Sequence, residues 1–173
     1  MMKVAKLIIL SCILFSCNQN QNKNVLSLSL DTVIKHNDSI NVFYTTDNTI
    51  NFIDKHSFWS KVKGNSKNQT IQIAFPDSIK PKQIRIDFGN NINNQEIVLN
   101  KICISYLESS FEAKGEEIYW HFRPDENNTV LDKKNGVLKR INPTQINGPS
   151  IYPKGDKLKE QLNLLYKKEA DDK

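Results

Sequence analysis

The sequence predicts an all-β fold, an antiparallel β-sandwich of the jelly-roll type that ends in a short helix. Several short segments alternate apolar and polar residues, which is the pattern of a strand with one buried face. Clusters of Asn, Gly and Pro separate these segments, as turns between antiparallel strands require. An α+β domain, in which the closing helix packs on a single sheet, is the alternative.

The first strand is predicted where Leu26, Leu28 and Leu30 alternate with polar residues, and the polar cluster 35–39 ends it. In the second, Val42 and Tyr44 share one face. Residues 52–63 are less regular. The predicted strands after the first are 40–45, 70–75, 84–88, 97–106, 117–122, 129–132 and 137–141.

The cleanest alternation in the chain is at 84–88, where three apolar residues share one face and Arg85 and Asp87 share the other. In the longer strand that follows, Asn100 and Lys101 interrupt the apolar run, which predicts a β-bulge. The predicted core residues of these two strands are Ile84, Ile86, Phe88, Ile102 and Ile104.

The C-terminal third contains one hairpin signal and one helix signal. Asn135-Gly136 between two apolar runs predicts a tight turn, whereas the prolines of 143–153 predict irregular chain. Asp156 can cap a closing helix, whose apolar stripe consists of Leu158, Leu162, Leu165 and Tyr166.

The N-terminus has the organisation of an export signal. Lys3 and Lys6 precede an apolar run at 7–15, which is too short to span a bilayer as a helix. The run ends in Leu14-Phe15-Ser16-Cys17, which resembles the lipobox of bacterial lipoproteins. The resemblance implies cleavage before Cys17, a diacylglyceryl thioether on its sulfur and an acyl chain such as palmitate on its amine. Cleavage at Cys12, an uncleaved anchor and a plain secretory signal are the alternatives.

The expected organisation follows from this cleavage site. Residues 1–16 form the signal peptide, 17–24 the lipidated cysteine and a polar tether, 25–155 the sandwich, and 156–173 the closing helix with a charged tail. The remaining 157 residues are enough for one domain with its own core. We expect a protein held at the bacterial envelope by lipid and facing the periplasm.

The charge and the cysteine count narrow the function classes. Removal of Lys3 and Lys6 lowers the net charge from +5 to +3, and the remaining cations are scattered among acids. A nucleic-acid partner is therefore not expected. Cys103, between two isoleucines, is expected to be a buried and inert thiol.

No catalytic, metal-binding or cofactor-binding residues are predicted. His36, His56 and His121 are far apart in the sequence, with no metal-ligand spacing. There is no phosphate-binding loop and no Gly-x-Ser-x-Gly motif. An enzyme is the third choice among the function classes, after a binding module and an interaction protein.

The candidate ligand-binding residues are Trp59, Arg85 and Tyr119. Both aromatic residues are expected to be exposed, where their rings could stack on a sugar. Arg85 could donate to a ligand hydroxyl or carboxylate, although a surface ion pair with Asp87 is the simpler interpretation. Trp120 alternates in phase with Ile118 and Phe122 and is expected in the core.

Two central segments, 83–89 and 97–104, resemble β-sandwich accessory domains of bacterial glycan-assembly proteins, with Phe88 in place of the proline usual there. The resemblance implies a jelly-roll-like sandwich and a link to surface carbohydrate. It leads to the expectation of a non-catalytic carbohydrate-binding module. A structural lipoprotein that meets another envelope protein through a strand edge or the closing helix is the alternative.

Overall fold

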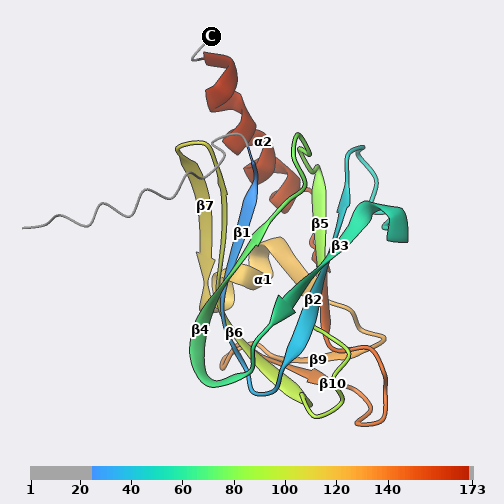
Figure 1. The fold of residues 1–173 in the computed structure, drawn as a ribbon. Coiled ribbons are helices and arrows are strands. Elements are labelled where there is room, and N and C mark those ends of the chain that lie inside the picture. Colours follow the sequence, from blue (N-terminus) through green and yellow to red (C-terminus); the bar gives the residue numbers. More distant parts are fainter. Residues whose placement is uncertain (1–24, 172–173) are drawn as a thin grey trace, which may run out of the picture.

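The computed structural model describes residues 25–171, with side chains to residue 167, and confirms an antiparallel β-sandwich with a helix near the C-terminus (Figure 1). Cys12, Cys17 and the segments predicted to be the signal peptide and the tether lie outside the described residues. The chain passes repeatedly from one sheet to the other, so each sheet contains strands from distant parts of the sequence.

The first sheet, sheet A, has six strands, of which five form the order β4-β1-β6-β10-β9, and β7 pairs with β6. Its strands are β1 (Ser27–Ile34), β4 (Asn65–Ala74), β6 (Glu96–Tyr106), β7 (Ser109–Lys114), β9 (Thr129–Asp132) and β10 (Val137–Arg140). The second, sheet B, has five strands in the order β3-β2-β5-β11-β8. Its strands are β2 (Asp38–Thr45), β3 (Ser57–Val62), β5 (Gln83–Asp87), β8 (Phe122–Pro124) and β11 (Ser150–Pro153).

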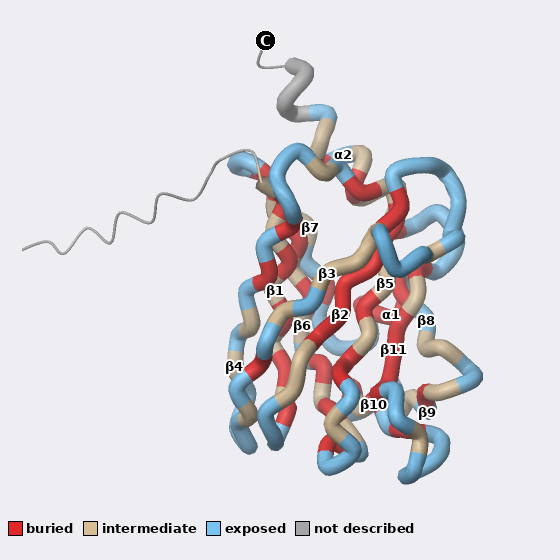
Figure 2. Tube along the Cα trace, turned by 45° about the vertical axis from the view of Figure 1, so that its right-hand side comes forward, coloured by how far each residue is buried: buried red, intermediate tan, exposed pale blue. Residues whose placement is uncertain are grey.

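The core lies between the two sheets and is built by the alternation that the sequence shows. All five predicted core residues of β5, β6 and the turn after β5 are buried. Figure 2 shows that buried chain lies mainly along the strands, whereas most loops are exposed. The register of β6 against β1 shifts between Asp31 and Thr32, which leaves Asn100 as the extra residue. The predicted bulge is therefore confirmed, and it explains how Leu99 and Ile102, three positions apart, both face the core.

The segment 117–122 is not a strand. It forms the short helices η2 (Gly115–Glu117) and α1 (Ile118–His121), followed by β8. Ile118 and Phe122 are buried, as either structure would require, because positions i and i+4 share a face in a helix and also in a strand. The helical turn places Trp120 outside, 54% exposed, so its predicted core position is wrong.

Three strands, β3, β7 and β11, have no counterpart in the prediction, which treats 52–63 as less regular and 143–153 as irregular. A 3-10 helix, η1 (Asp54–His56), precedes β3. The closing helix, α2 (Lys157–Asp171), is confirmed, with Leu158, Leu162 and Leu165 buried. Among the described residues, no helix is long and apolar enough to cross a membrane.

Candidate functional site

The outer face of sheet B carries a patch of side chains from neighbouring strands. Strand register places Trp59, Asn41 and Asp87 side by side on β3, β2 and β5, because Asn41 pairs with both of the others. In the adjacent row Phe43 pairs with Arg85. Tyr152 of β11 lies on the other side of Arg85. Directly opposed residues of a sheet are close enough for their side chains to touch.

Arg85 is held rigidly at the centre of this face. Its guanidinium carbon lies 4.6 Å from the ring centre of Phe43 and 4.5 Å from that of Tyr152. Its Nε and Nη2 donate to the two carboxylate oxygens of Asp87 at 2.8 and 2.7 Å. A bidentate pair between two rings fixes the planar group in one orientation.

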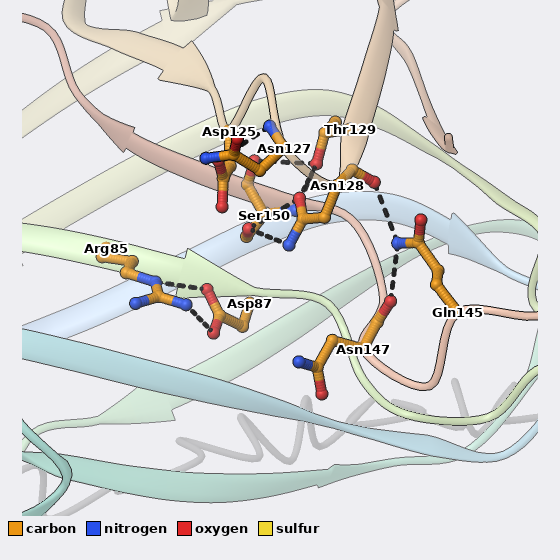
Figure 3. Close-up of polar contacts among 9 residues, drawn as sticks. All are labelled: Arg85, Asp87, Asp125, Asn127, Asn128, Thr129, Gln145, Asn147 and Ser150. Carbon is orange, nitrogen blue, oxygen red and sulfur yellow. Dashed lines mark hydrogen bonds and ion pairs between the residues drawn. The ribbon is translucent and has the colours of Figure 1, made fainter. Parts of the chain in front are cut away.

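The Arg85–Asp87 pair is more than a loose surface contact, since the two side chains are only 20% and 22% exposed. Burial raises the pKa of Asp87 above its ordinary value of 3.8, and this effect outweighs the opposing attraction of Arg85. Figure 3 shows the pair beside the polar cluster that holds the end of β11.

A hollow of about 300 Å³ opens over this face. Trp59 lines it and is 53% exposed, so part of its ring surface is available to a ligand. The remaining lining residues are Asn41, Phe43, Phe52, Asp54, Arg85, Asp87, Gly89, Asn90, Asn147 and Gly148. The structure therefore brings two of the three predicted ligand-binding residues, Trp59 and Arg85, to one site.

Asn41 is buried among these lining residues, and its Oδ1 has no hydrogen-bond partner within the described part of the chain. Buried amide groups are usually paired, and an unpaired one is found at functional sites. Nothing in the sequence separates Asn41 from the many other asparagines. Only the strand register reveals that it lies between Trp59 and Asp87.

The rim of the hollow depends on two glycines in contact. Gly148 N–H donates to Gly89 O at 2.7 Å. A Cβ on Gly148 would lie 2.0 Å from Phe88 O, which no side chain can tolerate. Gly89 has φ +73°, and a Cβ there would collide with the Asp38 carboxylate. Gly148 is glycine because the two loops touch through their backbones, and Gly89 is glycine because its φ is positive and the Asp38 carboxylate lies beside it.

Arg140 holds together the two loops that form this rim. Its guanidinium is buried and donates to five backbone carbonyls of the two loops, those of Asn91, Asn94, Gln145, Ile146 and Asn147. Burial lowers the pKa of Arg140, while the nearby Asp38 opposes this shift. The loop residues that line the hollow are thus positioned by one buried cation.

A polar cluster secures β11 beside Asp87. Ser150 N–H donates to Thr129 Oγ1 at 2.7 Å, and Asn128 Nδ2 donates to Ser150 Oγ at 2.9 Å. Gln145 Nε2 bridges Asn128 O and Asn147 O at 2.9 and 2.8 Å (Figure 3). The hollow therefore has a wall that is already organised in the free protein.

Tyr119, the third predicted ligand-binding residue, is 4% exposed, and the expectation that it is exposed is wrong. The helical turn of α1 directs it inward, whereas a strand would place it opposite Ile118. Burial raises the pKa of Tyr119 to about 12. Its ring does not line the hollow.

Cys103 is half-buried, which corrects the expectation of a fully buried thiol. Ile102 and Ile104 face the core, so the residue between them lies on the outer face of sheet A. Burial raises the pKa of Cys103, which keeps its sulfur largely protonated. In the part of the chain that the structure describes, no group of three or more His, Cys, Asp or Glu side chains could hold a metal ion.

Comparisons with protein-family models, with curated proteins and with solved structures find no match to this chain. The chemistry of the hollow is therefore the basis on which a function can be assigned.

Proposed function

We propose that this protein is a lipid-anchored envelope protein whose sandwich binds carbohydrate in the hollow over sheet B, without a catalytic step. The observation that carries the proposal is an exposed Trp59 in the same hollow as the rigid Arg85–Asp87 pair. Sugars present flat apolar faces and a rim of hydroxyls. A site for them needs an aromatic platform with a few fixed polar groups beside it.

Rigidity supports this assignment. Ordering a flexible arginine on binding costs free energy, and the clamp of Phe43 and Tyr152 removes most of that cost in advance. Asn90, which is exposed, adds an amide group beside the pair. The hollow thus offers donors and acceptors that need little rearrangement to meet a ring of hydroxyls.

The test is a glycan array on the full chain in detergent, followed by titration of any hit. The two tryptophans of the chain, Trp59 and Trp120, are 53% and 54% exposed, so they form a matched pair. We expect Trp59→Ala to weaken binding about tenfold or more. Trp120→Ala, which changes an equally exposed ring away from the hollow, should bind as the wild type does.

Tryptophan fluorescence provides an independent measurement of binding. In Trp120→Phe the remaining indole is Trp59. A glycan that stacks on it should change its emission with the same Kd as the titration. Equal affinity in Trp59→Ala and in the wild type would contradict the proposed platform.

The anchor forms part of the proposal and rests on the lipobox resemblance of residues 14–17. We expect mass spectrometry of the mature N-terminus to find an acylated Cys17. Cys17→Ala should move the protein to the aqueous phase in detergent partition. An unmodified N-terminus at another residue would refute the anchor and leave the sugar site untouched.

A protein partner in the envelope is the second candidate function, and one observation favours it. Ile92, Ile141 and Ile146 are 54%, 47% and 73% exposed on the loops that Arg140 joins. Exposed apolar residues gathered on one end of a domain are typical of a contact surface. Pull-down from envelope extract with one reproducible protein, together with no signal on the array, would favour this function.

A further inference from the structure

We propose that the hollow selects neutral sugars and rejects sugars that carry a carboxylate, an inference that rests on the proposed carbohydrate site and names its ligand class. A site with an arginine at its centre would ordinarily suggest an acidic ligand. In this hollow the surroundings of Arg85 favour a neutral ligand.

The charges of the hollow favour an uncharged ligand. Among the described residues that line it, Arg85 is the one cation, whereas Asp54 and Asp87 both bring carboxylates. The positive charge of Arg85 is balanced by Asp87 at 2.7 Å. An incoming carboxylate would therefore meet a balanced pair and a further negative charge, and like charges in a partly buried site repel strongly.

The hydrogen-bonding capacity that remains also fits hydroxyl groups. Arg85 has five N–H donors, and its Nε and Nη2 donate to Asp87, so donors are left over. Each Asp87 oxygen accepts one of these bonds and can accept another. The exposed edge of the pair thus presents donors beside acceptors. A hydroxyl group can use both, whereas a carboxylate can only accept.

Arg85 cannot easily leave Asp87 to meet an anion. The guanidinium lies over rings of both neighbouring strands, 4.6 and 4.5 Å away, and would lose these contacts by swinging out. Separation of the pair would also leave the Asp87 carboxylate, 22% exposed, without its partner. Leaving a buried charge unpaired is costly, so the pair stays together and recognises hydroxyls as a unit.

The experiment compares probes that differ in charge alone. The full chain in detergent is titrated with oligogalacturonate and with its methyl ester, beside neutral glucan, mannan and galactan oligosaccharides. We expect every bound probe to be neutral and the ester to bind at least tenfold more tightly than the free acid. Affinity for the neutral probes should change less than about twofold between low and high salt, because no ion pair with the ligand is screened.

Variants test the role of Asp87. Asp87→Asn removes the balancing charge, so we expect at least tenfold weaker binding of neutral probes and a relative gain for the acid. Asp54→Asn tests the second carboxylate even if Asp87→Asn fails to fold, and it should raise the affinity for the acid. Asp77→Asn, an exposed acid outside the hollow, is the matched control and should change neither.

The outcomes separate this inference from the proposed function. Binding of the acid as tightly as the ester overturns the selection of neutral sugars and leaves a carbohydrate site in place. Absence of binding by every probe, neutral and acidic, overturns both. An unchanged preference in Asp54→Asn and Asp87→Asn also overturns the inference, because the selection would then arise elsewhere.

Discussion

Replacement of Arg140, the buried last residue of β10, by methionine should destabilise this protein strongly. Methionine has an apolar stem like that of arginine, so the change removes the guanidinium while keeping the stem. Arg140 is 6% exposed, and its donors reach five carbonyls at 2.6 to 3.1 Å. Without them, several partly buried carbonyls lose their partners.

The expected loss is about 3 kcal/mol. A hydrogen bond to a charged group contributes about 1.5–3 kcal/mol, but the five are not additive, and release of a buried charge offsets part of the loss. For a chain of this size, about 3 kcal/mol corresponds to a fall in Tm of about 6–12 °C. Glycan affinity should fall as well, because Asn147 and Gly148 lose their support.

Urea unfolding followed by circular dichroism measures the change, provided that the slope stays constant. Arg140→Lys keeps the charge but loses the planar fork, so it should restore less than half of the stability. Arg123→Met, an exposed arginine, should change stability by less than about 0.5 kcal/mol. A loss below about 1 kcal/mol in Arg140→Met, or full stability in Arg140→Lys, would refute this account of the rim.

Three further changes test the core, the rim and the ion pair. Ile86→Ala, at a site with 0% exposure, should cost about 2–5 kcal/mol in urea unfolding, and a cost below about 0.5 kcal/mol would place Ile86 at the surface. Gly148→Ala should lower the Tm by several degrees because its Cβ collides with Phe88 O; an unchanged Tm would show that the loops do not touch. The pKa of Asp87 in the folded state is raised above 3.8, so between 3.8 and the raised pKa the folded state binds more protons than the unfolded state. The contribution of Asp87 to stability therefore falls as pH rises from 3.8 to the raised pKa. Subtracting the profile of Asp87→Asn from that of the wild type between pH 3 and 7 isolates this effect, and a difference that rises with pH would contradict it.

The sequence predicts most of the sandwich because a half-buried strand alternates apolar and polar residues. At 84–88 and 102–106 the alternation alone assigns the core face and the outer face correctly. At 118–122 the same signal misleads, since Ile118 and Phe122 share a face in both a strand and a helical turn. The structure then places Trp120 outside and Tyr119 inside, the reverse of the prediction.

The candidate site could be predicted only in part. Alternation places Arg85 and Asp87 together on the outer face, and Trp59 is expected to be exposed. The clamp on Arg85 comes from Phe43 and Tyr152, which are more than a hundred residues apart in the chain. That meeting depends on which strands pair and in which register, and neither is encoded in a local pattern.

The direction in which the chain enters the sandwich sets how the protein would stand on a membrane. β1 begins beside Ser105, and the neighbouring Tyr106 packs against Tyr166 of α2 at 5.4 Å, so the entry point and the helix share one end (Figure 1). The glycine rim lies at the opposite end, where Asn91 bonds the turn that follows β1. With lipid on Cys17, as proposed, the α2 end would rest nearest the headgroups and the rim would be membrane-distal. A glycan chain that approaches from the side away from the membrane would then meet the hollow before it met the bilayer.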